Sequence, residues 1–384
     1  MKQYWDVFWI ALRLGCISFG GPTAHMSYFR DEYVEKRKWM DEKSYADVVA
    51  LANFLPGPAS SQVGMAMGIT RGGLTGGILA WLGFTLPSMI ILMLFAMFVQ
   101  APLTQASWIH SLKLVAVVVV AQAVFEMGKK LAPDRMRQTL LLAVTVSIFL
   151  FPSSYTQLFA LIGSGIVGYI VYNGYEETSK SEIVSLSKRT GLLAFTSFFG
   201  LLVLLPLLRT VVSSKLFALF AIMYRTGSLV FGGGHVVLPL LEQEIVRNGW
   251  MSKDLFLAGY GLTQAVPGPL FTFATYIGAV THGFWGAIVA TIGIFLPAFL
   301  LIVDGLSSWN TMRQNKVLRP ALLGINAGVV GILLAASYDP IFIGAVKTTM
   351  DIVLVFLYFM LLHVWRLSPW MVVAIAFICG FMSF

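Results

Sequence analysis

The stretch Leu55-Pro56-Gly57-Pro58 and its second copy Val266-Pro267-Gly268-Pro269 decide how this chain folds. Each stretch lies inside an apolar run, at 45–67 and at 255–278. Proline removes a backbone donor and glycine adds conformational freedom, so one continuous helix through both prolines is implausible. At membrane depth, irregular backbone is tolerated only against protein or a water-filled cavity. We therefore predict that a helix breaks at each stretch; a simple packing kink is the alternative.

The landmarks around the two breaks recur in the same order. They are Phe-Gly-Gly at 19–21 and 231–233, Trp-Met at 39–40 and 250–251, and Leu-Pro at 86–87 and 296–297. Equivalent positions lie 210 to 212 residues apart, and a repeat of this kind sets the architecture. We expect an N-terminal repeat at 1–175, a linker with a connecting transmembrane helix at 176–212, and a C-terminal repeat at 213–384.

The composition is that of a membrane protein. Hydrophobic residues make up 58% of the 384 residues, charged residues only 11%, and the mean hydropathy is +0.81. A soluble domain carries about 25% charged residues, so soluble enzymes, nucleic-acid binders and secreted disulfide modules are disfavoured. The net charge of +8 fits an excess of Lys and Arg in cytoplasmic loops and gives no indication of a nucleic-acid partner.

The apolar runs predict an all-α polytopic membrane protein of about 13 spans, six in each repeat and one between them. Six crossings return the chain to its starting side, and the unmatched run 192–208 then turns the second copy over. Two repeats in inverted topology are a common plan of secondary transporters. The distribution of Lys and Arg favours a cytoplasmic N-terminus and an outside C-terminus. Whether the short fifth run of each repeat crosses fully stays open.

Two arginines occupy equivalent positions in the first apolar run of each repeat. Arg13 and Arg225 each lie six residues before a Phe-Gly-Gly motif. An arginine at the centre of a spanning helix costs ~2.5–3.5 kcal/mol, so it usually faces a partner or a watery cavity. Its planar fork of donors suits an oxyanion, which makes both arginines candidate ligands. Alternatively, they bond carbonyls of a broken helix or extend to the membrane interface.

A helix that restarts after each break presents free N–H groups, and a helix N-terminus is an anion site. Pro58 and Pro269 suit the first turn of such a helix. The residues that we expect to face a bound anion here are Gly57, Ser60, Ser61, Gln62, Gly268 and Thr272.

Further candidate ligands surround the Phe-Gly-Gly motifs and precede the breaks. These are Gly20, Gly21, Thr23, His25, Gly232, Gly233 and His235 at the motifs, and Asn53 and Gln264 before the breaks. Glu32 and Glu244 are equivalent acids that could couple protons, although a solvated loop face is the plainer interpretation. We find no catalytic constellation, metal-ligand cluster or cofactor motif, so passage of a substrate is favoured over its chemical conversion.

These motifs, in order and twice, resemble the chromate ion transporter (CHR) family in its long, two-domain form. The segments that carry the resemblance are Phe19-Gly20-Gly21-Pro22-Thr23-Ala24-His25, Leu55-Pro56-Gly57-Pro58-Ala59-Ser60-Ser61-Gln62, Phe231-Gly232-Gly233-Gly234-His235 and Val266-Pro267-Gly268-Pro269. The resemblance implies a protein of the bacterial cytoplasmic membrane that exports chromate and confers chromate resistance. A transporter or channel for sulfate-like anions is the alternative, and a membrane-embedded enzyme is disfavoured. The expected partners are chromate or sulfate, the lipid bilayer and, as one open assembly, a second copy of the chain.

Overall fold

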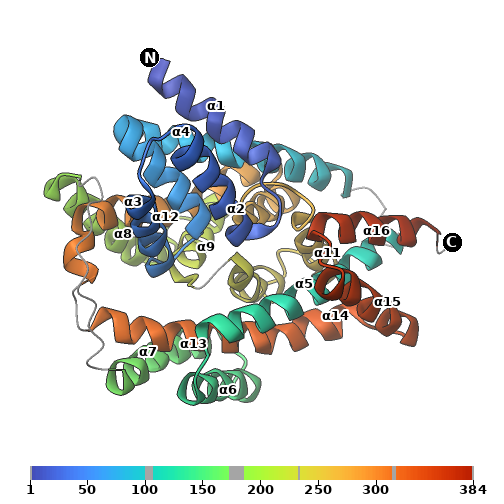
Figure 1. The fold of residues 1–384 in the computed structure, drawn as a ribbon. Helices are drawn as coiled ribbons and strands as arrows, with labels where there is room; N and C mark the ends of the chain where they lie inside the picture. The colour runs from blue at the N-terminus through green and yellow to red at the C-terminus, as the bar shows by residue number, and fades with distance from the viewer. Residues whose placement is uncertain (1, 100–106, 173–185, 232–233, 314–316, 383–384) are drawn as a thin grey trace. The chain divides into compact units, whose positions relative to one another are not determined.

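The computed structural model describes residues 2–99, 107–172, 186–231, 234–313 and 317–382, and all regular structure in these ranges is helical (Figure 1). In the first half the helices are α1 (Lys2–Ile17), α2 (Gly21–Phe29), a π-helical turn (Arg30–Lys36), α3 (Glu42–Phe54), α4 (Ala59–Val99), α5 (Ser107–Leu131), α6 (Arg135–Leu150), α7 (Ser154–Val171) and α8 (Lys188–Leu208). In the second half they are α9 (Lys215–Leu229), α10 (Val237–Leu241), α11 (Lys253–Thr263), α12 (Phe273–Arg313), α13 (Leu318–Ala336), α14 (Ile343–Ala345), α15 (Thr349–Phe359) and α16 (Pro369–Met382). Short 3-10 segments precede α10 (Gly234–Val236) and α12 (Leu270–Thr272), and π-helical turns span Glu242–Val246, Ser337–Phe342 and Met360–Val364.

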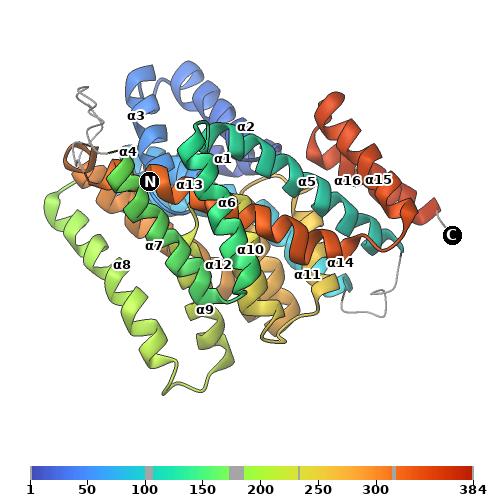
Figure 2. The same cartoon turned by 90° about the horizontal axis from the view of Figure 1, so that it is seen from below.

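Five segments in the described part of the chain are long and apolar enough to cross a membrane. They are Ala59–Met97, Trp108–Leu131, Lys188–Leu208, Leu270–Trp309 and Leu318–Ala345. The predicted extra helix between the repeats is among them, and Figure 2 shows it as α8, which leads into α9. The helices of the two arginines, α1 and α9, are only 16 and 15 residues long. The all-helical class with several apolar helices is confirmed, while the count of thirteen spans and the inverted topology stay predictions.

The chain packs into two compact units that do not follow the repeat boundaries. Unit 1 comprises Met1–Phe95, Glu177–Gly234 and Val266–Gln314. Unit 2 comprises Ala96–Glu176, His235–Ala265 and Asn315–Phe384. Each unit therefore takes portions of both copies, and both Pro-Gly-Pro stretches fall in unit 1. The portions do not match throughout, because 24–54 belong to unit 1 whereas the equivalent 235–265 belong to unit 2.

Both predicted helix breaks are present. In the first copy α3 ends at Phe54 and α4 begins at Ala59. In the second copy α11 ends at Thr263, and helical structure resumes only at Leu270. The central glycines Gly57 and Gly268 have backbone φ angles of 118° and 104°, which residues that carry a side chain rarely adopt. Glycine is thus required at the turning point of each break.

The two 41-residue helices of unit 1, α4 and α12, each contain a sharp kink, which lies just beyond the end of the apolar runs 45–67 and 255–278. It occurs at Gly72-Gly73 in α4 and at His282-Gly283 in α12, and both second glycines have φ of 61°. The two arms of each helix then pack at very short range. A Cβ on Gly68 would lie 2.3 Å from the Gly76 carbonyl oxygen, and one on Gly278 would lie 2.1 Å from that of Gly286. Each long helix is therefore a tight helical hairpin.

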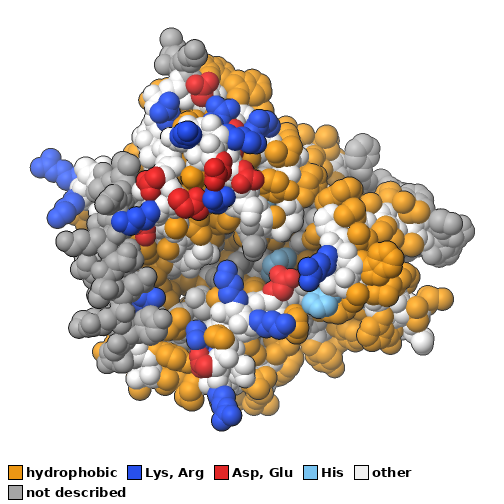
Figure 3. Space-filling model, viewed as in Figure 1, with side chains coloured by type: hydrophobic (Ala, Val, Ile, Leu, Met, Phe, Trp, Pro, Cys, Tyr) orange, Lys and Arg blue, Asp and Glu red, His pale blue; other side chains and the backbone are white. Residues whose placement is uncertain are grey.

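The surface of unit 1 separates charged and apolar residues. Figure 3 shows basic and acidic side chains mixed on the visible face around α3. Arg30, in the π-helical turn before α3, forms ion pairs with Glu35 and Glu42. On α8, by contrast, Leu192, Leu193 and Val203 are more than half exposed. Exposed apolar surface of this extent is typical of a helix that faces lipid.

In unit 2, α5, α6, α7, α13 and α16 approach one another at small residues. A Cβ on Gly324 of α13 would lie 1.9 Å from the Ser164 carbonyl oxygen of α7. A Cβ on Gly331 would lie 2.4 Å from the Leu141 carbonyl oxygen of α6. On α16, Gly380 packs against the backbone of Trp108 on α5. Close contact through small residues is the usual way in which membrane helices associate.

We predict that Gly278→Ala destabilises the protein, because its methyl group would collide with the carbonyl of Gly286. Overpacking typically costs ~1–3 kcal/mol, which outweighs the gain of ~0.5–1 kcal/mol from replacing a helical glycine by alanine. Gly163→Ala on α7 is the matched control, since no atom lies within 4 Å of its added Cβ. Thermal unfolding of the purified variants should show a lowered midpoint for Gly278→Ala and an unchanged or raised one for Gly163→Ala. A raised midpoint for both would contradict the hairpin packing.

Candidate functional site

A pair of crossed backbone hydrogen bonds joins the two breaks in unit 1. The N–H of Gly57 donates to the carbonyl of Val230, which follows α9 of the second copy, at 2.7 Å. The N–H of Gly268 donates to the carbonyl of Ser18, which follows α1 of the first copy, at 2.9 Å. Each break therefore caps the end of the first helix of the other copy. The carbonyls at a helix end need such partners, so the two breaks stabilise each other.

His25 connects this junction to the start of α4. Its Nε2 lies 3.1 Å from the Ser18 carbonyl oxygen and its Nδ1 lies 3.2 Å from the Ser60 hydroxyl oxygen. A carbonyl only accepts, so Nε2 carries the proton, and in the neutral ring Nδ1 accepts from the Ser60 hydroxyl. The imidazole is 1% exposed and packs edge-on against Phe84. His25 is thus held at both nitrogens and fixes where α4 begins.

Gln62 joins the first break to the long helix of the other copy. Its Nε2 donates to the Pro56 carbonyl at 3.0 Å and lies 3.4 Å from the Ala298 carbonyl oxygen. The packing is matched at the equivalent positions. A Cβ on Gly57 would lie 2.9 Å from Cβ of Ala298, and one on Gly268 would lie 3.0 Å from Oγ of Ser88. Each break therefore packs just after the proline of the opposite hairpin.

Four polar side-chain atoms around this junction are buried and have no hydrogen-bond partner within the described part of the chain. They are Oγ of Ser18, Oγ of Ser61, Oε1 of Gln62 and Oγ1 of Thr85. Burying an unpaired polar group costs ~1–3 kcal/mol, and such groups in a native structure call for an explanation. The three hydroxyls are potential donors, and that of Ser61 lies in the first turn of α4, where a helix N-terminus can bind an oxyanion.

The second break lacks this polarity. The positions that match Ser60, Ser61 and Gln62 hold Phe271, Thr272 and Phe273. Thr272 is buried, and its hydroxyl donates to the Pro269 carbonyl at 2.6 Å. The junction therefore combines a repeated backbone with donors that belong mainly to the first copy.

The first arginine is already paired. Arg13 donates through Nη2 to Glu32, whose side chain is only 4% exposed while that of Arg13 is 53% exposed. Glu32 also accepts from Nε of Arg37 at 2.7 Å and lies 3.9 Å from Nζ of Lys36. Burial alone would raise the pKa of this loop carboxyl, but Arg37, Arg13 and Lys36 outweigh it and hold the pKa below its usual value. Glu32 is therefore ionised at neutral pH and is a poor proton carrier.

In the second copy Arg225 is half-buried on α9 of unit 1. Glu244 is buried in unit 2, in the π-helical turn that follows α10. The same turn holds Glu242, which sequence analysis missed because Arg30 occupies the equivalent position in the first copy. Glu242 is 5% exposed, and burial raises the pKa of its carboxyl, while Arg247 at 3.4 Å opposes that rise. Glu242 is thus better suited than Glu32 to take up a proton.

The other predicted ligands are dispersed. Gly20 and Gly21 form the left-handed turn into α2, with φ of 94° and 76°. Asn53 is exposed, and its amide donates to the Val49 carbonyl of its own helix. In unit 2, His235 bonds the Tyr260 hydroxyl at 2.7 Å, and Gln264 is buried with its Nε2 unpaired among the described residues. Gly232, Gly233 and the side chain of Thr23 lie outside the described residues.

The predicted ligands include the polar residues after the first break but not Ser18 and Thr85. Ser18 adjoins the Phe-Gly-Gly motif, and Thr85 lies two residues before the repeated Pro87. Their proximity to a repeated landmark was the available signal. Within the described ranges, no group of three or more His, Cys, Asp or Glu side chains could hold a metal ion.

Comparison with known proteins points to one family. The family model described as "Chromate transporter" matches residues 5–169 and 217–381. A "Chromate transport protein" of Pseudomonas aeruginosa is 28% identical over 88% of this chain and 81% of its own length. A "Chromate transport protein" of Cupriavidus metallidurans is 25% identical over 97% of this chain and 91% of its own length. An uncharacterized transporter of Methanocaldococcus jannaschii is 27% identical over 98% of this chain and 94% of its own length. No solved structure matches the chain.

The neighbouring serines Ser60 and Ser61 test the described junction. Ser60→Ala removes the donor to His25 and leaves a buried nitrogen unpaired, so we expect a loss of ~1–3 kcal/mol of stability. Ser61→Ala removes a buried hydroxyl without a partner in the described part of the chain, so stability should stay equal or rise. The measurement is the thermal midpoint of both purified variants. Equal losses in the two variants would contradict the assigned hydrogen bonds.

Proposed function

Because this chain belongs to the chromate transporter family, we propose that it exports chromate across the bacterial cytoplasmic membrane and so confers resistance to chromate. The chain is a secondary transporter in this proposal, with its N-terminus in the cytoplasm. A dianion is held at the junction of the two breaks, between the N-termini of the restarted helices and the arginines Arg13 and Arg225. The named chromate transport proteins among its relatives support chromate as the substrate.

The observation that carries this binding mode is the set of unpaired buried hydroxyls at the first break. A tetrahedral oxyanion accepts several hydrogen bonds and has none to donate when it is fully ionised. Hydroxyls of Ser18, Ser61 and Thr85 would supply donors, and the free N–H groups at the start of α4 would add the positive end of a helix dipole. Because these hydroxyls are buried, the anion reaches them only when the packing around the junction opens. A rearrangement of the helices around the junction, as in the alternating access of secondary transporters, would provide that opening.

The arginines supply the charge that neutral donors lack. A guanidinium carries five N–H donors, and the described pair with Glu32 engages only Nη2 of Arg13. Arg13 can therefore bind an oxyanion while Glu32 holds it in place. Arg225 occupies the equivalent position on α9. The two positive charges would match the charge of chromate.

The direction of transport follows from the charge of the substrate. An inside-negative potential drives a dianion outward by ~2.3 kcal/mol per charge for every 100 mV. Export thus needs no coupled proton, and Glu32 and Glu244 act as coupling residues only if a proton accompanies the anion. Sulfate has the same charge and shape, so a transporter or channel for sulfate-like anions remains the alternative.

We predict that Arg13→Gln and Arg225→Gln each weaken chromate binding at least tenfold, because a hydrogen bond to a charged group is worth ~1.5–3 kcal/mol. Arg→Lys keeps the charge but loses the fork, so its effect should be smaller. Binding of labelled chromate to purified protein measures both. Arg209→Gln, an exposed arginine between α8 and α9, is the matched control.

The variant Glu32→Gln tests whether Arg13 binds the anion itself or acts only through its ion pair with Glu32. If Arg13 acts only through its pair with Glu32, Glu32→Gln and Arg13→Gln will weaken binding equally. If Arg13 contacts the anion, Glu32→Gln will retain most of the affinity. Wild-type affinity in both Arg→Gln variants would refute the role of the arginines.

Flux in everted membrane vesicles tests the function itself. Everted vesicles that contain the protein should accumulate labelled chromate when an inside-positive potential is imposed, since this corresponds to export from the cell. Collapse of the potential should abolish accumulation. Uptake of sulfate at the same rate, with chromate as a poor competitor, would favour the alternative. Absence of chromate flux in either direction would refute the proposal.

A further inference from the structure

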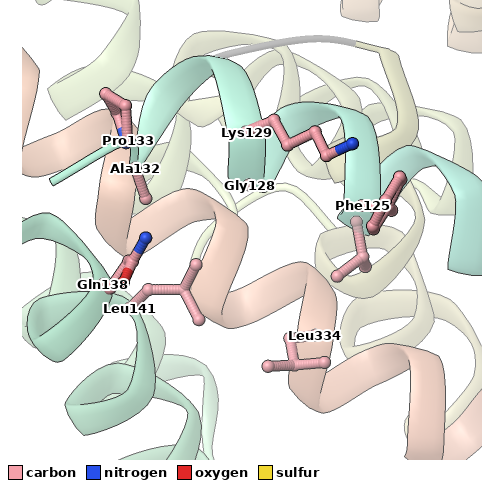
Figure 4. Close-up of a pocket in the computed structure, with 9 residues that line it drawn as sticks. Phe125, Gly128, Lys129, Ala132, Pro133, Gln138, Leu141 and Leu334 are labelled. Atoms are coloured by element: carbon pink, nitrogen blue, oxygen red, sulfur yellow. The ribbon is translucent and has the colours of Figure 1, made fainter. Parts of the chain in front are cut away.

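Unit 2 contains a pocket between α5, α6 and α13. Its volume is about 450 Å³, within the usual range of small-molecule sites. Figure 4 shows Lys129 and Gln138 at its edges, with Leu141 and Leu334 along its floor. The floor continues into a buried apolar cluster that contains Ala132, Leu141, Ala327 and Val330. The pocket therefore combines a polar rim with an apolar base.

Basic residues outnumber acidic residues around the rim of the pocket. Lys129 is exposed and lies over the ring of Phe125 at 4.0 Å, and it forms no ion pair with a described residue. Lys130 and Arg135 nearby are also exposed and form no ion pair within the described ranges. Two acids are nearby: Asp134 accepts from Arg137 and from the Tyr172 hydroxyl, and Glu126 on α5 accepts from the Gln122 amide. The rim thus presents net positive charge to an anionic group.

We propose that this pocket binds an anionic phospholipid, with the phosphate at Lys129 and Gln138 and an acyl chain on the apolar floor. The amide of Gln138 can donate to phosphate oxygens, and it has no side-chain partner in the part of the chain described. Under the predicted topology, this connection between α5 and α6 faces the cytoplasm, where anionic lipids attract basic residues. A free oxyanion would use the rim but would leave the apolar floor uncovered.

Gly128 is the position at which an added side chain would enter the pocket. It lies on α5 and lines the pocket, and an added Cβ there would meet no atom within 4 Å. A larger side chain at this position would therefore fill the pocket without displacing the protein around it. Gly163 on α7 has an equally free Cβ position but does not line the pocket, so it supplies a matched control.

The experiment uses the full chain, delipidated in detergent and placed in nanodiscs of phosphatidylcholine with a small share of phosphatidylglycerol. Mass spectrometry of the repurified protein measures the phosphatidylglycerol that it retains. Wild type and Gly163→Leu should retain the lipid, whereas Gly128→Leu should lose it. Lys129→Gln should lower retention about fivefold and Lys129→Arg should preserve it, since a surface lysine contributes ~1 kcal/mol to the attraction.

Two results would overturn the proposal. One is equal retention of phosphatidylglycerol by wild type, Gly128→Leu and Lys129→Gln. The other is an equal gain in thermal stability from inorganic phosphate and from phosphatidylglycerol in wild type, which would make the pocket an ion site. Lys129→Gln and Lys129→Arg leave the helix intact and keep the test valid if Gly128→Leu misfolds. Chromate flux is not a readout here, so failure of the proposed function leaves this test unaffected.

Discussion

The crossed hydrogen bonds at the two breaks are the constraint on which unit 1 depends. A backbone that leaves the helix inside an apolar environment must find partners for its N–H and C=O groups. Here the Gly57 N–H and the Val230 carbonyl satisfy each other, as do the Gly268 N–H and the Ser18 carbonyl. In both cases the partner belongs to the other copy. The interleaving of both copies in one compact unit follows from this requirement.

Sequence periodicity identifies equivalent positions but not contacts. Both breaks could be predicted, because proline and glycine act on their own backbone. The crossed bonds could not, because an offset of about 211 residues shows that Gly57 matches Gly268 and does not show what either one touches. The kinks at Gly72-Gly73 and His282-Gly283 fall where the apolar runs 45–67 and 255–278 have ended, so the sequence indicated a turn there but not how closely the two arms pack. Asn53 was selected for its matching position, yet α3 turns its side chain to the surface.

The repeat is more symmetric in its backbone than in its chemistry. Positive φ glycines, hairpins and packing glycines occur at matching positions in both copies. By contrast, Ser60, Ser61 and Gln62 have mainly apolar counterparts in the second copy, and His25 has no counterpart at its exact offset. A symmetric scaffold with donors on one side suits a single anion site rather than two. The same asymmetry makes the first copy the place to look for the substrate.

The position of a bound anion tests this account most directly. Anomalous diffraction at the chromium edge, from crystals of the protein with chromate, locates the metal of the substrate without reliance on mutants. The account predicts an anomalous peak in unit 1, within hydrogen-bonding distance of the Ser61 hydroxyl and the N-terminus of α4. A peak elsewhere, such as at Lys129, with none at the break would contradict it.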